Sequence, residues 1–263
     1  KNIMMKIIFL ILLLVSGPSI LADQLREALE SSDRKAENVI RDIYRNPYET
    51  ITFFKIKPNM KVIELSPGGG WYTEILANYL SDSGLLIAAH FNPEIKNNYL
   101  KRSRANFENM LSSKENFRKV KLVNLDSALA PTESVDAVLT FRNLHNWLGP
   151  NMDNIFQNSF NALKPGGFFG IVEHRAKPGT SIKKMKQSGY VTEMHAIEIA
   201  ESIGFKLVGK SEINANPNDT TDHPKGVWTL PPTLRMKDVD RSKYLQIGES
   251  DRMTLLFVKP TKS

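Results

Sequence analysis

The sequence contains no cysteine among its 263 residues. This absence excludes disulfide bonds, thiolate nucleophiles, lipid attachment to cysteine and metal sites with cysteine ligands. It is compatible with export but does not demonstrate it. Stability must come from a hydrophobic core, and 41% hydrophobic residues in a chain of this length suffice for one sizeable core. We therefore expect a single domain with additions.

An apolar run of the roughly 20 residues that a spanning helix needs is also missing. The apolar stretch at residues 7–15 follows Lys6 and precedes Gly17-Pro18 and Ala22. A positive start, a short apolar centre and a small residue before the cleavage point are typical of a secretory signal peptide. We predict that residues 1–22 are a signal peptide removed on export to the periplasm. The alternative is an uncleaved signal that anchors the protein to the membrane.

Positive charge is present in only a small excess. The formal net charge is +7, and removal of residues 1–22 takes away Lys1 and Lys6 and no acid, which leaves +5. The basic residues are scattered, and the one cluster, at 183–186, is typical of a solvated loop. The charge distribution therefore predicts no nucleic-acid partner.

Metal-binding spacings are absent as well. The five histidines form no H-x-x-x-H pair, which would place two imidazoles on one helix face. We therefore expect no metal site. The histidines are His90, His145, His174, His195 and His223.

What the sequence does contain is a regular alternation of strand and helix patterns. This alternation predicts an α/β fold with a mostly parallel sheet covered by helices on both faces. We predict strands at 61–65, 85–90, 120–124, 135–141, 168–174, 205–211 and 252–258. Helices are predicted at 71–80, 95–112, 151–163 and 192–203, the last ended by Gly204 as a left-handed cap.

Two additions flank this pattern within a domain at 23–263. The segment 23–55 is a predicted helical extension: apolar positions recur at helical spacing over 24–45 until Asn46-Pro47, and a short helix follows near 49–54. The segment 212–250 is a long insertion before the last strand. Its Trp228 and Leu230 are too apolar for a disordered segment, so we expect a loop packed over the ligand face.

The run Glu64-Leu65-Ser66-Pro67-Gly68-Gly69-Gly70 follows an apolar strand and precedes a helix. Glycines there let backbone N–H groups approach a ligand while the helix directs its positive end toward it. The run therefore predicts a cofactor-binding loop, and the alternative is a turn that only packs helix on strand. The loop lacks G-x-G-x-x-G and no acid follows the second strand, which argues against a dinucleotide oxidoreductase.

Five markers in order resemble those of class I S-adenosylmethionine-dependent methyltransferases, over most of residues 35–260. Together with the predicted signal peptide, they also resemble a group of exported bacterial predicted methyltransferases. The resemblance implies a Rossmann-like seven-stranded sheet and S-adenosylmethionine as methyl donor. The markers are Val62-Ile63-Glu64 with its glycine loop, Phe91-Asn92-Pro93-Glu94, Leu125-Asp126, Val135-Asp136-Ala137-Val138 and Leu163-Lys164-Pro165-Gly166-Gly167.

The resemblance also implies which residues bind the donor. Gly68 and Gly70, with Gly69 between them, would approach its methionyl part and ribose, and Glu64 would order the loop or reach the amino group through water. Asp126 would accept from the adenine amine. The adenine ring would lie between Leu125 and Phe141.

Two positions depart from the family pattern. Ser66 stands where the family usually has its first glycine. His90 stands where an acid usually binds both ribose hydroxyls, so Asn92 or a neutral His90 must substitute with uncharged hydrogen bonds.

Acceptor-side candidates follow predicted strands four and five, where open parallel sheets place their ligands. His145 is a candidate general base for a hydroxyl acceptor, or else a capping residue. His174 with Glu173 would orient the acceptor or steady the loop. Arg142 and Arg175 would bind a substrate carboxylate or phosphate, or pair with nearby acids.

Three further residues are candidates near the ligand. Tyr190, which precedes a predicted helix, would line the pocket. Trp228 and His223, in the 212–250 insertion, would form a lid or anchor the loop.

The sequence thus predicts S-adenosylmethionine-dependent methyl transfer to a small molecule or an envelope component. The donor is made in the cytoplasm, so an exported enzyme would need imported donor. The alternative is a non-catalytic exported binding or sensing protein on the same fold, which would explain the altered Ser66 and His90 positions.

Overall fold

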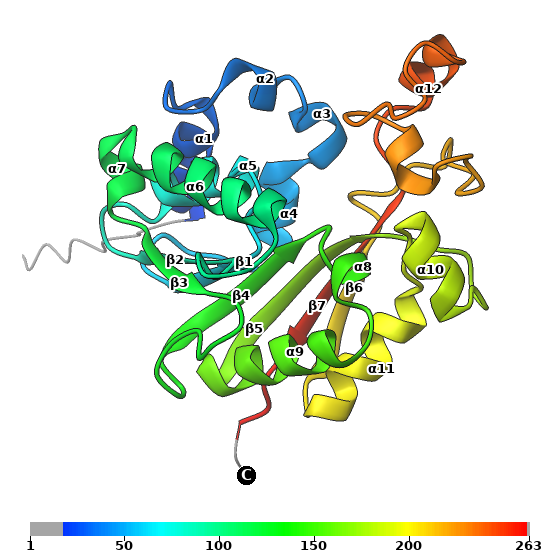
Figure 1. Cartoon of the computed structure of the whole chain (residues 1–263). Coiled ribbons are helices and arrows are strands. Elements are labelled where there is room, and N and C mark those ends of the chain that lie inside the picture. Colours follow the sequence, from blue (N-terminus) through cyan, green and yellow to red (C-terminus); the bar gives the residue numbers. More distant parts are fainter. Residues whose placement is uncertain (1–17, 262–263) are drawn as a thin grey trace, which may run out of the picture.

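The computed structural model describes residues 18–261 (Figure 1). Most of the predicted signal peptide, residues 1–17, lies outside the described residues. The predicted cleavage point after Ala22 falls within helix α1 (Pro18–Glu30). Over the described range, we find no helix with the length and apolarity needed to cross a membrane.

A single seven-stranded sheet forms the centre of the fold, which confirms the predicted fold class and all seven strands. Six strands start and end within one residue of the predicted bounds, and β5 starts earlier. The order across the sheet is β3-β2-β1-β4-β5-β7-β6. The strands are β1 (Lys61–Leu65), β2 (Leu85–His90), β3 (Lys121–Asn124), β4 (Val135–Phe141), β5 (Leu163–His174), β6 (Lys206–Ser211) and β7 (Arg252–Val258).

The sheet is parallel except at one end. β1 pairs in parallel with β2 and with β4, whereas β7 runs antiparallel between β5 and β6. β5 begins at Leu163, five residues before the predicted start, and its pairing with β4 shifts register before Ala137 pairs with Phe168. The Lys164-Pro165-Gly166-Gly167 run lies within this irregular start of β5. Its proline has no backbone N–H to donate, which interrupts the pairing of the strands.

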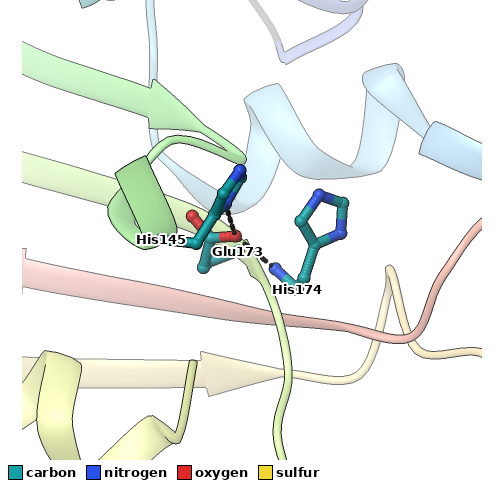
Figure 2. A group of neighbouring side chains, drawn as sticks. All are labelled: His145, Glu173 and His174. Carbon is teal, nitrogen blue, oxygen red and sulfur yellow. Dashed lines mark hydrogen bonds and ion pairs between the residues drawn. The ribbon is translucent and has the colours of Figure 1, made fainter. Parts of the chain in front are cut away.

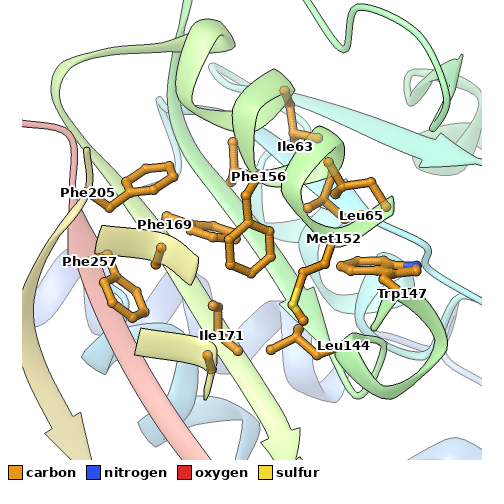
Figure 3. Packing of buried hydrophobic residues seen from close by; sticks show 14 of the residues in the cluster. Ile63, Leu65, Leu144, Trp147, Met152, Phe156, Phe169, Ile171, Phe205 and Phe257 are labelled. Atoms are coloured by element: carbon orange, nitrogen blue, oxygen red, sulfur yellow. The ribbon is translucent and has the colours of Figure 1, made fainter. Parts of the chain in front are cut away.

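Helices cover both faces of the sheet and bury a core on each (Figure 1). One face carries α8 (Leu144–Trp147), α9 (Pro150–Ala162), α10 (Ile182–Ser188) and α11 (Glu193–Ile203); the other carries α1, α4 (Pro47–Phe53), α5 (Trp71–Tyr79), α6 (Asn98–Ser112) and α7 (Glu115–Arg118). Figure 3 shows the first core, where Phe156 meets Phe169 edge-on at 4.9 Å between ring centroids. Gly204 ends α11 at φ +112°, as predicted.

The predicted continuous helix over 24–45 is wrong. α1 ends at Glu30, and two short helices follow, α2 (Ala36–Val39) and α3 (Asp42–Arg45). Ser31 accepts the Asp33 N–H through its side chain, and Arg34 Nη1 donates to the Leu29 carbonyl at 2.8 Å. These local hydrogen bonds replace helical ones, which ends α1 and turns the chain toward the carboxyl ends of the strands.

The insertion at 212–250 contains two helices, the 3₁₀ helix η1 (Gly226–Thr229) and α12 (Arg241–Ile247). In Figure 1 this segment, coloured yellow to orange-red, lies beyond the ends of the strands, across from α3. It therefore stands at the edge where β1 and β4 end.

The strand order changes direction between β1 and β4, because β2 and β3 lie to one side and β5 to the other. Open α/β sheets bind ligands at such a switch point. The residues that follow the two strands, Ser66 and Arg142, both have left-handed backbones, at φ 47° and 62°. Non-glycine residues in this region are held there by their surroundings and cluster at functional sites.

Candidate active site

Two cavities open at the carboxyl ends of the strands and meet at the switch point. We call the one of about 830 Å³ the Asp126 cavity and the one of about 390 Å³ the arginine cavity, which Arg41, Arg45 and Arg142 line. Both have sizes typical of small-molecule sites. The residues that line both are Ser66, Gly68, Asn143, His145 and Trp228.

The glycine loop faces these cavities. A Cβ atom added at Gly68 or Gly69 would meet nothing within 4 Å, and Gly68 has a φ of +60°. The Ser66 hydroxyl is buried and finds no hydrogen-bond partner in the part of the chain that the structure describes. Gly70 lines neither cavity; it precedes α5, and a side chain there would collide with Met110.

Glu64 lies behind the loop and lines neither cavity. Its Oε2 accepts from the Thr73 hydroxyl at 2.6 Å, which joins β1 to α5. Burial raises the pKa of Glu64 to about 7, against smaller opposing effects of the Thr73 hydrogen bond and the Arg142 charge. Glu64 is therefore placed where it can order the glycine loop, and its carboxylate lines neither cavity.

His90 is fully buried and does not line a cavity either, so the expectation that it replaces the ribose-binding acid is not met. Its Nδ1 accepts the Phe91 N–H at 2.8 Å, and its Nε2 lies 3.4 Å from the Gly68 carbonyl oxygen. Burial lowers the pKa of His90 to about 4, so the ring is neutral and Nε2 donates. His90 therefore supports the glycine loop from behind.

Asp126, Asn92 and Leu125 all line the Asp126 cavity. The Asn92 amide lies 3.4 Å from the Asp126 carboxylate. Phe91, Trp147 and Ile155 line the same cavity beside Leu125 and give it apolar walls.

Phe141 is not part of that wall, and the predicted sandwich of Leu125 and Phe141 is wrong. The Phe141 ring stacks on Tyr72 at 3.5 Å between centroids and lines the arginine cavity. Leu125 belongs to the core on the α9 face, whereas Phe141 belongs to the core on the α5 face. The sheet separates the two side chains, so they cannot hold one ring between them.

His145, Glu173 and His174 come together at the junction of the cavities (Figure 2). The buried Glu173 carboxylate accepts from three N–H groups: His145 Nδ1 at 3.0 Å, the Leu144 amide at 2.5 Å and the His174 amide at 2.8 Å. Because a carboxylate only accepts, His145 carries its proton on Nδ1 and presents the lone pair of Nε2. This arrangement gives His145 the form of an oriented general base.

His174 lines the arginine cavity and bonds to Ser250 Oγ at 2.6 Å through Nδ1. Burial is the largest cause that lowers the pKa of His174 well below its ordinary value, and the charges of Arg142 and Arg252 lower it further. The His174 ring is therefore neutral near pH 7 and forms part of the cavity wall without adding charge.

The same three residues could hold a metal ion, because one ligand atom from each lies within 4.8 Å of the others. The linear spacing of the histidines does not reveal this cluster. A metal ion would have to compete with three N–H groups for Glu173, and the neighbouring Arg142 guanidinium disfavours a cation.

Tyr190 and His223 line neither cavity, so Tyr190 is not at its predicted place in the pocket, and His223 takes the loop-anchoring alternative in place of the lid. The Tyr190 hydroxyl donates to Asp219 at 3.0 Å, and His223 Nε2 lies 2.8 Å from the same carboxylate. Asp219 also accepts the Asp251 N–H, so this group anchors the insertion to the sheet. Trp228, by contrast, lines both cavities and meets the His145 ring at 6.0 Å between centroids.

The two arginines singled out from the sequence have different surroundings. Arg175 bonds to Asp251, Glu193 and Glu212, and this pairing raises its pKa. Arg175 therefore helps to pack the insertion against the rest of the fold. Arg142 lines the arginine cavity, with Glu249 as its nearest acid at 3.6 Å.

Sequence reasoning missed Arg41, Arg45 and Glu249. The two arginines stand four residues apart, which in a sequence is typical of a solvated helix face. Their partner Glu249 is 208 and 204 residues away, and both guanidinium groups bond to it. A pairing of this sequence separation exists only in the folded chain.

Comparisons with known proteins agree with this geometry. Residues 63–171 match the family model described as a methyltransferase domain. No curated protein sequence matches the chain. The chain has the class I methyltransferase fold.

Solved structures share the fold at low sequence identity. A SAM-dependent methyltransferase from Aquifex aeolicus is 15% identical with a TM-score of 0.51, covering 73% of this chain and 93% of its own. An arsenic(III) S-adenosylmethionine methyltransferase from Chlamydomonas reinhardtii is 14% identical with a TM-score of 0.52, covering 90% and 73%. The cyclase SpnF is 13% identical with a TM-score of 0.60, covering 92% and 94%. The methyltransferase domain supports S-adenosylmethionine as methyl donor, while the likenesses themselves show the fold alone.

The raised pKa of Glu64 predicts a pH-dependent stability. Because the folded pKa of about 7 exceeds the ordinary 4.5, the folded protein binds more protons between these values. The free energy of unfolding should therefore fall as pH rises from 4.5 to 7, by roughly 3 kcal/mol from this group. Glu64→Gln keeps an acceptor for Thr73 and should remove that fall, as measured by urea unfolding at pH 5 and pH 8.

The matched control is Glu201→Gln on the exposed side of α11, which should leave the pH dependence unchanged. Equal pH profiles for Glu64→Gln and the unaltered protein would show that Glu64 is ionised across this range in the fold.

Proposed function

We propose that this protein transfers the methyl group of S-adenosylmethionine to a small molecule, or to the small reacting group of an envelope component. The observation that carries the proposal is the junction of two cavities at one oriented histidine, His145. One cavity has the features of a donor site and the other has room for an acceptor.

The residues of the Asp126 cavity fit the donor. Gly68 presents open space where a side chain would stand, and the buried Ser66 hydroxyl has no hydrogen-bond partner among residues 18–261. At the other end, Asp126 offers an exposed carboxylate acceptor beside the apolar wall of Leu125. When bound, S-adenosylmethionine supplies a methyl group on a sulfonium, which an aligned nucleophile can take in one displacement.

The chain's own part in the reaction is to align the acceptor and take its proton. His145 Nε2 receives the proton of an acceptor hydroxyl, and Glu173 stabilises the imidazolium that forms through its bond to Nδ1. Trp228 excludes water from the junction, because it lines both cavities beside His145.

The first prediction concerns donor binding. Calorimetry should detect binding of S-adenosylmethionine and of S-adenosylhomocysteine to the protein, but no binding of NAD. Asp126→Ala removes the acceptor for the adenine amine. Gly68→Val strains a backbone at φ +60° and fills the open space beside the loop. Each variant should weaken binding at least tenfold, on the order of a lost charged hydrogen bond.

Asp238→Ala, in the exposed part of the insertion, is the control and should bind as the unaltered protein does. If neither adenosyl ligand bound at millimolar concentration, methyl transfer would be refuted. Binding of donor without product from any acceptor would leave a sensing protein.

The second prediction concerns the general base. His145→Gln should lower the rate of S-adenosylhomocysteine release with hydroxylated small acceptors by roughly 10²–10⁴-fold, because the proton loses its acceptor. Donor affinity should stay within about threefold. His195→Gln, on α11 and outside both cavities, should retain full activity. An unchanged rate for His145→Gln would assign His145 to packing.

We also propose that the protein is exported with cleavage after Ala22, on the strength of the charged start and apolar stretch of residues 1–22. Mass spectrometry of material from the periplasmic fraction should give a chain that begins at Asp23. A chain from that fraction that still starts at Met4 or Met5 would refute cleavage and favour the anchored form.

A further inference from the structure

The arginine cavity carries positive charge that the protein does not neutralise. Four guanidinium groups surround one buried carboxylate, Glu249: Arg41 Nε at 2.7 Å, Arg45 Nε at 3.1 Å, Arg252 Nη1 at 3.3 Å and Arg142 Nη1 at 3.6 Å. Glu249 is the one acid among the described residues that line this cavity. One carboxylate cannot balance four cations, so the cavity attracts an anion.

Two of these arginines also have hydrogen-bond donors to spare. Arg45 is 3% exposed, and its Nη1 is buried without a partner in the described chain. Arg142 has an ion pair at 3.6 Å and no side-chain hydrogen bond within residues 18–261, and burial lowers its pKa to about 10. Buried donors without partners are costly, which favours a ligand that supplies the acceptors.

Arg252 provides the contrast within the same cluster. Its guanidinium donates to the carbonyl oxygens of Ser250 and Tyr44 as well as to Glu249, and it does not line the cavity. Within the described residues, the arginine outside the cavity has partners for its guanidinium, whereas Arg45 and Arg142, which line the cavity, keep donors without partners.

We propose that the arginine cavity binds an oxyanionic group, a carboxylate or a phosphate, of the methyl acceptor. The proposal deepens the proposed function and rests on it, because an acceptor needs the donor in the neighbouring cavity. The guanidinium group presents paired N–H donors that match either oxyanion. The volume of about 390 Å³ suits a small molecule.

The cavity walls hold the arginines in place before any ligand arrives. The Arg45 guanidinium lies over the Trp71 ring at 4.6 Å, and the Trp71 indole N–H donates to the Asn38 carbonyl at 2.9 Å. An oxyanion held there leaves the rest of the acceptor to extend toward His145 and Trp228, which line the same cavity. The oxyanion then positions the nucleophile for proton transfer to His145.

The donor has a carboxylate of its own, and Gly68 and Gly69 line this cavity too. The experiment must therefore separate an anion of the acceptor from the methionyl carboxylate. Saturating the protein with S-adenosylhomocysteine does so, because that compound fills the donor's carboxylate site and leaves an acceptor site empty.

We would titrate the saturated protein with sodium phosphate and with sodium acetate at constant ionic strength set by KCl. Tryptophan fluorescence is the readout, because Trp71 and Trp228 line the arginine cavity and Trp147, the third tryptophan, lines the other. We expect one of the anions to give a saturable change. A response to phosphate alone identifies a phosphorylated acceptor, and a response to acetate alone a carboxylic acid.

The variants are Arg45→Gln and Arg142→Gln, and the control is Arg118→Gln, which removes the same charge from an exposed position on α7. Each cavity variant should weaken anion binding about tenfold or more while donor-product affinity stays within about threefold, since a charged hydrogen bond is lost only with the anion. Arg118→Gln should change neither. Unchanged affinity for S-adenosylhomocysteine also shows that a variant is folded.

Three results would overturn the proposal. The first is no saturable response beyond that of KCl. The second is displacement of S-adenosylhomocysteine by the anion, with weaker donor-product binding in the arginine variants, which would assign the arginines to the methionyl carboxylate. The third is an arginine-dependent anion response in a protein that binds no adenosyl ligand: the proposed function would fail, and with it the acceptor role of the site.

Discussion

The site depends on one buried carboxylate. Glu249, 4% exposed, comes just before β7 and bonds to arginines from α3, from the residue before α3 and from β7 itself, while Arg142 after β4 lies within ion-pair distance. It thereby joins the first helices, the centre of the sheet and the end of the insertion. Removing this carboxylate would leave four guanidinium groups without their counter-charge, which is strongly destabilising. The carboxylate therefore fixes both the cavity wall and the excess of positive charge in it.

The positions of the two cavities follow from the strand order. The Asp126 cavity lies over the ends of β1, β2 and β3, and the arginine cavity lies over β1, β4 and the insertion. Four of their five shared residues come from the segments that follow β1 and β4, the two strands where the order reverses, and the fifth, Trp228, comes from the insertion. A reaction between two ligands needs such a shared boundary, and His145, oriented by the buried Glu173 of β5, stands on it.

The sequence predicts the parts of the fold that depend on local pattern, and it misses those that depend on distant partners. Strand alternation places Asp126 at a strand end and hence at the ligand edge, and the structure puts it in a cavity. Phe141 was misassigned because its position in β4 does not reveal which face of the sheet its side chain takes. Tyr190 was misassigned because its partner Asp219 lies in an insertion without a regular pattern. Arg45 was overlooked because its partner is 204 residues away.

The surroundings of His90 favour a histidine over the acid that the family usually has at this position. An acid at this fully buried position would place a carboxylate beside the Gly68 carbonyl oxygen, where two acceptors repel, whereas neutral His90 donates to that oxygen. The ring also stacks on Phe107 at 5.0 Å, which suits an uncharged imidazole. The histidine thus supports the glycine loop. Asn92, the other residue that the sequence suggests for the ribose, does line the cavity beside Asp126 and carries an uncharged amide.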